Sequence, residues 1–255
     1  MSIASDSRPQ PWNSQLISVQ AYQSGQAHAP TASPGRALLK MSSNENLAGP
    51  APAVRERLIS CLSNLCLYPQ GSGQALKERL AQRHGLDSAR ITLGNGSNEV
   101  LDFLGRCFLA PGKQSVCARH AFSVYGLVTQ ICGARLEVAE ANPPDHRMPY
   151  GHNLDAMLEK INAQTAIVFI ANPNNPTGTC LSEVELRGFL DRVPSSLPVV
   201  VDQAYIEYAG EDCAHADLWL DDYPNLVVTR TFSKVFALAG LRIGCLLYTS
   251  DAADE

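Results

Sequence analysis

Short apolar runs that end in polar residues alternate with amphipathic segments along most of this chain. The clearest apolar runs are RITLGNG (90–96), TAIVFIANPNNPTG (165–178), LPVVVDQAYIEY (197–208) and NLVVTRTFSK (225–234). Strands that alternate with helices in this way favour a mostly parallel sheet whose two faces are both covered by helices. We therefore predict an α/β fold built as a three-layer α/β/α sandwich.

The segments between these runs have the spacing of helices and of further strands. Helices are predicted at 52–63, 73–85, 97–108, 123–132, 153–162 and 182–193, and further strands at 115–122 and 134–140. Asn153 stands where a helix cap is expected, and Ser182 opens a Ser-x-x-Glu capping box. These signals fix the order of the elements along the chain.

Composition excludes several classes of partner. The chain has 255 residues, 45% of them hydrophobic, and a formal net charge of −5. Because there is no basic stripe or cluster of lysine and arginine, we expect no nucleic-acid partner. No apolar segment approaches the length that crosses a bilayer, so we expect no membrane association.

The eight cysteines form no CxxC pair and no Cys/His cluster with zinc spacing. Most stand within apolar runs, where a free cysteine acts as a small hydrophobic residue. The first residues lack the pattern of a signal peptide. We therefore expect no metal site, a reducing compartment and a cytoplasmic protein.

Polar residues follow the apolar runs, at the edge of the predicted sheet where ligands of such folds bind. The clusters are Gly94–Asn98, Asn172–Gly178, Asp202–Tyr205 and Thr229–Lys234. The first is a glycine turn that opens a helix, a place suited to phosphate. Taken alone, that turn is more often structural than functional, because glycine turns before helices are common.

Asp202 and Tyr205 each allow two interpretations. A carboxylate at the end of a buried strand needs a cationic or N–H partner. Asp202 could cap the next turn, or it could hold a protonated ring nitrogen of a ligand. Tyr205 could contact a ligand oxygen, or it could simply pack with its hydroxyl in water. The two Asn-Pro steps of NPNNPTG fix the backbone and direct Asn175 toward the same edge.

Lys234 lies between a hydroxyl-rich turn and an apolar run. In isolation, a lysine that extends from a strand end into water is the favoured interpretation. A desolvated lysine near another cation is instead a nucleophile toward aldehydes. The phosphate turn, carboxylate, phenol, asparagine and amine together fit one cofactor, pyridoxal 5′-phosphate bound as a Schiff base.

Six motifs in their expected order carry a family resemblance. They are SSNEN (42–46), LYPQGSG (67–73), LGNGSNE (93–99), NPNNPTG (172–178), VDQAYIEY (201–208) and RTFSKVFALAGLRIG (230–244). From about residue 20 to 244 the chain resembles the fold-type I pyridoxal-phosphate aminotransferases. Within them it is most similar to the histidinol-phosphate aminotransferase subfamily.

The resemblance implies a role for each matching residue. Lys234 would bind the cofactor aldehyde, Asp202 would pair with the pyridinium nitrogen, and Tyr205 would hold O3′ with Asn175. Phe122 would stack on the ring. The residues implied around the phosphate are Gly96, Ser97, Asn98, Thr231, Ser233 and Arg242. Further implied contacts are Tyr68 to the phosphate of a partner subunit, which implies a homodimer, and Tyr22 and Asn46 to substrate.

The implied activity is amino transfer from histidinol phosphate to 2-oxoglutarate in histidine biosynthesis, giving imidazole acetol phosphate and glutamate. Lys234 would carry the proton as general base and acid. Two alternatives within the family are a threonine-phosphate decarboxylase and an aromatic amino-acid aminotransferase. Two non-enzymatic alternatives are a module that senses pyridoxal phosphate and an inactive fragment. The first of these needs a helix-turn-helix, for which residues 1–36 have neither the helical period nor the charge.

The chain departs from the family pattern at two places and at its end. Gln203 stands where the family usually has glutamate, and His120-Ala121-Phe122 replaces Pro-Thr-Tyr. We expect an N-terminal arm or small-domain segment at 1–36, a cofactor-binding large domain at 37–244 and an incomplete small domain. Residues 245–255, CLLYTSDAADE, resemble a translated sequencing adapter and are expected to be a non-native tail. The alternative is a genuine terminal strand at 246–249.

Overall fold

The computed structural model describes Val19 and residues 41–249. The expected contact at Tyr22 lies outside the described residues, as does the predicted arm at 1–36 apart from Val19.

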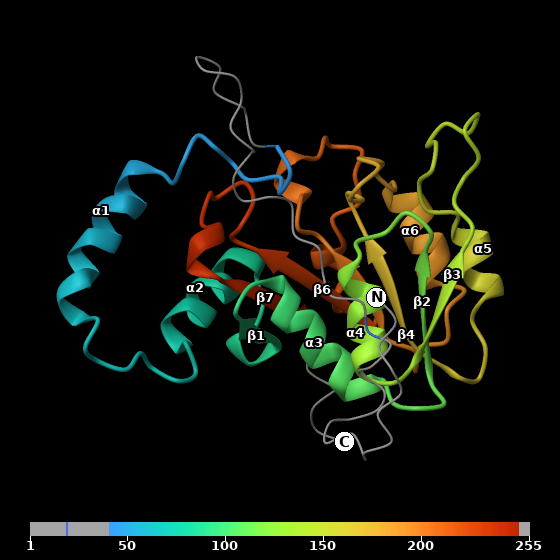
Figure 1. Ribbon diagram of the computed structural model, residues 1–255, viewed down its shortest axis with the longest axis horizontal. Coiled ribbons are helices and arrows are strands. Elements are labelled where there is room, and N and C mark those ends of the chain that lie inside the picture. Colours follow the sequence, from blue (N-terminus) through green and yellow to red (C-terminus); the bar gives the residue numbers. More distant parts are fainter. Residues whose placement is uncertain (1–18, 20–40, 250–255) are drawn as a thin grey trace, which may run out of the picture.

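A seven-stranded sheet forms the centre of the described residues, and it is mostly parallel as predicted (Figure 1). Its order is β1-β7-β6-β5-β4-β2-β3. The strands are β1 (Ile91–Gly94), β2 (Gln114–Ala118), β3 (Arg135–Ala139), β4 (Thr165–Ala171), β5 (Val199–Asp202), β6 (Leu226–Thr231) and β7 (Gly244–Tyr248). Neighbouring strands from β3 to β6 run parallel, whereas β7 is antiparallel to both β1 and β6.

Register brings the functional strand ends together. Ala171 of β4 lies opposite Asp202 of β5, and Asp202 lies opposite Thr229 of β6. The predicted strands were longer than these, because each prediction included the polar residues that follow. Those residues leave the sheet as turns above its carboxyl edge.

Helices cover both faces of the sheet. The α-helices are α1 (Pro52–Cys61), α2 (Gln74–His84), α3 (Ser97–Phe108), α4 (Val124–Ile131), α5 (Leu154–Glu159) and α6 (Glu183–Leu190). The 3₁₀ turns are η2 (Leu62–Asn64), η3 (Ser88–Arg90), η4 (Ile206–Tyr208), η5 (Ala216–Trp219) and η6 (Ala239–Leu241). The cap at Asn153 and the capping box at Ser182 are both present.

Two apolar clusters, one on each face, hold the three layers together. Val199 and Val201 of β5 pack in the cluster that includes residues of α2, α5 and α6. Val200 packs in the other cluster, with residues of α3 and α4. All three valines are fully buried, and burial of each side chain contributes roughly 1.5–3 kcal/mol. This confirms the predicted three-layer sandwich.

Strand β7 contains residues from the segment expected to be a non-native tail. Gly244–Tyr248 pairs with β1 on one side and with β6 on the other. Cys245 and Leu247 are fully buried in this position. The proposed boundaries at 37 and 245 stay predictions, and residues 245–248 fold as part of the sheet.

The cysteines differ from expectation in two respects. Cys180 and Cys213 are joined by a disulfide, whereas the other described cysteines are free. Cys61, Cys66 and Cys107 are exposed instead of buried in apolar surroundings.

Candidate functional site

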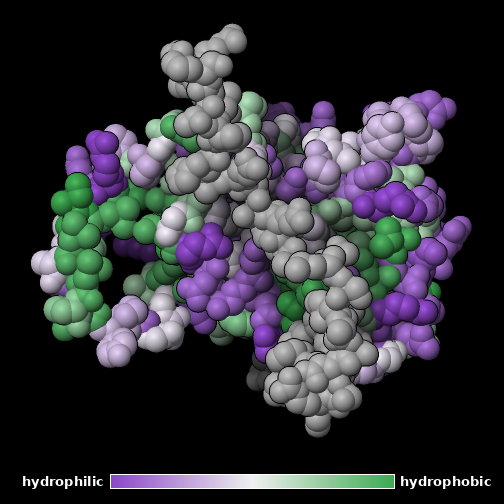
Figure 2. Space-filling model, in the orientation of Figure 1, coloured by the Kyte–Doolittle hydropathy of each residue, from purple (hydrophilic) through white to green (hydrophobic). Residues whose placement is uncertain are grey.

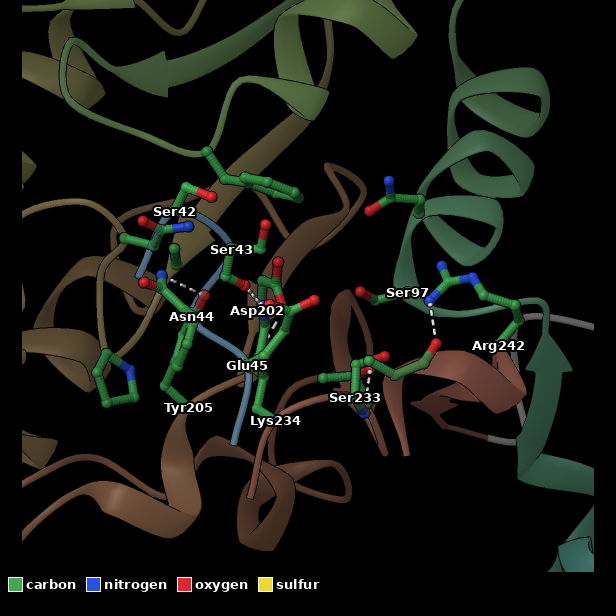
Figure 3. A pocket seen from close by; sticks show the side chains of 18 residues that line it. Ser42, Ser43, Asn44, Glu45, Ser97, Asp202, Tyr205, Ser233, Lys234 and Arg242 are labelled. Carbon is green, nitrogen blue, oxygen red and sulfur yellow. Dashed lines mark hydrogen bonds between the residues drawn. The ribbon is translucent and has the colours of Figure 1, made fainter. Parts of the chain in front are cut away.

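A cavity of about 310 Å³ opens at the carboxyl edge of the sheet. Most of the residues singled out in the sequence line it (Figure 3). The predicted residues that it brings together are Ser97, Asn98, Phe122, Asn175, Asp202, Tyr205, Thr231, Ser233, Lys234 and Arg242. Segments far apart in the sequence therefore meet in one place, as the parallel topology requires.

Asp202 ends β5 and is buried at the base of this cavity. Thr229 Oγ1 donates to its Oδ1 over 2.9 Å, and Tyr125 OH donates to its Oδ2 over 2.9 Å. Burial raises the pKa of the Asp202 carboxyl above its ordinary value, while the hydrogen bonds from Tyr125 and Thr229 act in the opposite direction. A cation bound at this carboxylate would compensate its lost hydration.

Tyr125 is a site residue that the sequence analysis missed. It lies in α4, is fully buried and stacks on Phe169 with ring centroids 4.9 Å apart. Burial, followed by the Asp202 charge, raises the pKa of its hydroxyl well above the ordinary value, so the group remains a donor. No local sequence pattern signals this contact, because Tyr125 and Asp202 lie 77 positions apart in the chain.

Lys234 follows β6 and extends across the cavity toward Tyr205. Its Nζ donates to the carbonyl oxygen of Ser43 over 3.0 Å and lies 5.4 Å from the centroid of the Tyr205 ring. Asn44 Nδ2 donates to the Tyr205 hydroxyl over 3.1 Å. The SSNEN segment therefore contacts both side chains that are candidates for chemistry.

Asn46 was expected to contact substrate, but it does not line the cavity. Its Nδ2 donates to the carbonyl oxygen of Val235 over 2.8 Å, which anchors the SSNEN segment beside Lys234. The cavity wall is formed instead by residues 42–45.

The N-terminus of α3 forms the opposite end of the cavity. Gly96 caps this helix with a φ of 81°, and a Cβ there would lie 2.3 Å from an Arg242 guanidinium nitrogen. Gly244 is equally confined, since a Cβ would lie 2.5 Å from the backbone nitrogen of Ser97. Only glycine lets the turn, the helix start and Arg242 approach this closely.

Hydroxyl and guanidinium groups converge at this end. Thr231 Oγ1 donates to Ser233 Oγ over 3.1 Å, and Arg242 donates to the carbonyl oxygen of Asn95 over 3.3 Å. Figure 3 places Ser97 and Arg242 on one side of the cavity, and Tyr205 on the other. Free N–H groups at a helix start, together with a guanidinium group, suit an anion.

Tyr68 lies apart from this cavity. Its side chain is 100% exposed, and it does not line the site. The role expected for it concerns the cofactor of a partner subunit, so its exposure within one chain leaves that role a prediction.

Gln203, the departure from the family pattern beside Asp202, is fully buried. Its side chain donates to the carbonyl oxygen of Ala214 over 3.1 Å and accepts from Arg230 over 3.4 Å. The Arg230 charge is balanced by Glu207 and Asp217 at 2.8 and 3.3 Å. Glu207 and Asp217 thus neutralise Arg230, although its neighbour Gln203 carries no charge.

Within the described ranges, Val19 and 41–249, the structure contains no cluster of three or more His, Cys, Asp or Glu side chains placed to hold a metal ion. In the same part of the chain, every helix is too short or too polar to span a bilayer. The expected cytoplasmic location stays a prediction.

Comparison with known proteins identifies the family. Residues 36–255 match the family of class I and II aminotransferases. The chain belongs to this family, as its motifs predicted.

Two curated relatives are histidinol-phosphate aminotransferases. The one from Stutzerimonas stutzeri is 50% identical over 85% of this chain and 57% of its own length. The one from Methylococcus capsulatus is 46% identical over 85% of this chain and 59% of its own length. The chain therefore spans less than two thirds of the length of these relatives.

A solved structure is similar over the same region. It is histidinol-phosphate aminotransferase from Sinorhizobium meliloti in complex with pyridoxal-5′-phosphate. The TM-score is 0.74 with 28% sequence identity, and the match covers 81% of this chain and 55% of the other.

Proposed function

We propose that this chain contains the cofactor-binding part of a pyridoxal-phosphate-dependent aminotransferase. The observation that carries this proposal is one cavity that is lined by a buried carboxylate, a lysine amine and the N-terminus of a helix, whose free N–H groups suit an anion. The family match and the relative solved with pyridoxal-5′-phosphate support it.

The donor set fits pyridoxal phosphate group by group. Asp202 is a buried carboxylate that would pair with the protonated ring nitrogen, and the Lys234 amine would bind the aldehyde. Tyr205 and Asn175 would hydrogen-bond the ring oxygen O3′, and Phe122 would contact the ring face. The residues that would hold the phosphate are Gly96, Ser97, Asn98, Thr231, Ser233 and Arg242.

When bound, pyridoxal phosphate supplies a conjugated ring that takes up the electron pair left when a proton leaves the substrate Cα. Asp202 would keep a proton on the ring nitrogen and so favour this charge. The free Lys234 amine would act as general base toward the substrate Cα proton and as general acid toward the cofactor carbon C4′. The Ser43 carbonyl oxygen, which accepts from Nζ, would orient the amine.

For the whole protein we propose transfer of the amino group of histidinol phosphate to 2-oxoglutarate, within histidine biosynthesis. The names of both curated relatives favour this substrate over threonine phosphate or an aromatic amino acid. The chain spans little more than half of the length of those relatives, so this activity is proposed for the whole protein. For the chain itself, the test is cofactor binding.

We also propose that the protein acts as a homodimer. Helix α1 has no buried residue, and the following segment exposes Leu65, Leu67 and Tyr68 by 76%, 67% and 100%. Figure 2 shows apolar residues gathered at the end of the molecule where α1 lies in Figure 1. An apolar surface of this kind favours a protein partner, and a second copy would bring Tyr68 toward another cofactor site.

Absorbance spectroscopy tests the cofactor proposal. Addition of pyridoxal phosphate to the chain is expected to produce the visible absorbance of a lysine-bound cofactor, and Lys234→Ala is expected to abolish it. A Lys113→Ala variant, changed on the opposite edge of the sheet, should keep the absorbance. Unchanged absorbance in Lys234→Ala would refute the role of this amine. Glutamate formation from histidinol phosphate by the whole protein tests the substrate.

A further inference from the structure

Two cysteines outside the proposed catalytic set lie beside the cofactor cavity. Cys180 follows the NPNNPTG loop after β4, and Cys213 lies between η4 and η5. Their Cα atoms are 5.7 Å apart, and the residues are joined by a disulfide. A Cα separation of about 4.4–6.8 Å allows a disulfide to form or open without backbone movement.

The two thiols differ in access. Cys180 is partly exposed and lines an open cavity of about 550 Å³, whereas Cys213 is only 6% exposed. That cavity shares Asn44, Asn175 and Tyr205 with the cofactor cavity. A small molecule that enters it reaches the sulfur of Cys180 first.

The bridge joins the two segments that carry Asn175 and Tyr205. Beside it, the backbone N–H of Ala214 donates to the carbonyl oxygen of Leu181 over 2.9 Å. The side chain of Gln203 donates to the carbonyl oxygen of Ala214 over 3.1 Å. When the disulfide is closed, this contact between segments is covalent as well as hydrogen-bonded.

We propose that Cys180 and Cys213 form a thiol–disulfide site, open to low-molecular-weight disulfides, that sets how firmly Asn175 and Tyr205 are held at the cofactor cavity. The bond itself is independent of the proposed function, whereas its effect on the cofactor rests on that function.

The chemistry is a two-step exchange with glutathione disulfide as the oxidant. The Cys180 thiolate attacks one sulfur of glutathione disulfide, breaks its S–S bond and releases one glutathione as thiolate. The Cys213 thiolate then attacks Cys180 Sγ, forms the protein disulfide and releases the second glutathione. Two electrons pass from the cysteine pair to glutathione disulfide, and the two cysteine protons end on the released thiols.

Closure is expected to stabilise the fold and to pre-organise the site. The bonded residues are separated by 33 positions, so the bridge constrains a long loop of the unfolded chain. Oxidation should raise the Tm by roughly 5 °C or more. It should tighten the binding of pyridoxal phosphate by about threefold or more, because ordering of the two segments is then partly complete before binding.

Bond formation is tested first, without cofactor. The full chain is reduced, exposed to a glutathione disulfide and glutathione buffer, trapped with a thiol-blocking maleimide and mapped by peptide mass spectrometry. A Cys180–Cys213 cross-linked peptide is the expected result. Cys180→Ser and Cys213→Ser should each abolish it, while Cys107→Ser, changed at the exposed end of α3, should not. Pairing of either cysteine with a different residue, or no bond in the folded protein, would overturn the proposal.

Cofactor affinity is then measured by fluorescence titration with pyridoxal phosphate, on the reduced and oxidised wild type and on the Cys180→Ser, Cys213→Ser double variant. Tighter binding only in the oxidised wild type is the expected result. Equal affinity in both redox states would refute the coupling, whereas the absence of cofactor binding in either state would refute the proposed function and leave the disulfide result standing. If the double variant does not fold, the reduced wild type still gives the affinity of the protein without the disulfide.

Discussion

The carboxyl ends of β5 and β6 and the segment from α1 to Tyr68 are built in opposite ways. At the strand ends, Asp202 and Thr229 are buried and bonded to each other. Helix α1 contains 10 residues and buries none of them. Helices this short are marginal in water unless another surface packs on them. Hydrogen bonds within this chain therefore hold the Asp202 carboxylate in place, whereas α1 needs a second molecule to pack against it.

The largest expected effect comes from the first region. Asp202→Asn should weaken the binding of pyridoxal phosphate by about 30-fold or more, because loss of one member of a buried charge pair costs about 2–5 kcal/mol. Equilibrium dialysis measures the affinity. Asp221→Asn, at a carboxylate that is 81% exposed, is the matched control and should bind normally. Equal affinities for the two variants would contradict the assignment of Asp202.

Tyr125→Phe tests whether the same region is held by its internal contacts. The variant keeps the stack on Phe169 but removes the hydrogen bond to Asp202. Loss of a hydrogen bond to a charged group should lower the free energy of unfolding by about 1.5–3 kcal/mol in urea denaturation. Tyr248→Phe removes an exposed hydrogen bond to Ala89 and should cost less. If the two substitutions cost the same, Tyr125 does not support the carboxylate in the way described.

The segment from α1 to Tyr68 is tested by measuring dimerisation, not the free energy of unfolding. Tyr68→Ala should weaken dimerisation by about tenfold, since truncation of an interface aromatic side chain often costs more than 1 kcal/mol. Analytical ultracentrifugation over a concentration series measures this change. Leu218→Ala, a residue that is 74% exposed in η5, is the control and should leave the dimer unchanged. A wild-type chain that is monomeric at every concentration would remove the proposed role of α1.

The smallest effect concerns His152, whose ring bonds the last residue of β4. It is buried, and its Nε2 bonds the carbonyl oxygen of Ala171 over 2.8 Å. Burial lowers the pKa of its imidazole below the ordinary value of 6.5. The unfolded chain therefore binds the proton more readily, and the stability due to neutral His152 is present above pH 6.5 and is lost as pH falls below it.

Urea unfolding at pH 7.5 and 5.5 measures this dependence. Between these pH values, the free energy of unfolding of the wild type should fall by more than that of His152→Gln, which cannot titrate. Parallel pH dependences for the two proteins would show that the imidazole is not held neutral in the fold.

The contrast between the two regions also explains what could be predicted from the sequence. The sandwich and the edge that carries the site follow from apolar runs ending in polar residues, as at Asp202 and Lys234. Tyr125 was missed because its importance comes from contact with a strand 77 positions away, which no local pattern records. The bond from the Asn46 amide to Val235 could not be foreseen either, because it depends on where residues 42–46 lie beside Lys234, and the substrate role of Asn46 stays a prediction. The pairing of Cys180 with Cys213 likewise depends on the three-dimensional approach of two loops.

The central claim is that Lys234 is the amine that binds the cofactor aldehyde, and one measurement tests it directly. The chain is incubated with pyridoxal phosphate, reduced with borohydride, digested and mapped by mass spectrometry. The lysines that could carry the label are Lys40, Lys77, Lys113, Lys160 and Lys234. We predict a single phosphopyridoxyl group on Lys234. A label spread over the other lysines, with Lys234 unmodified, would contradict the account.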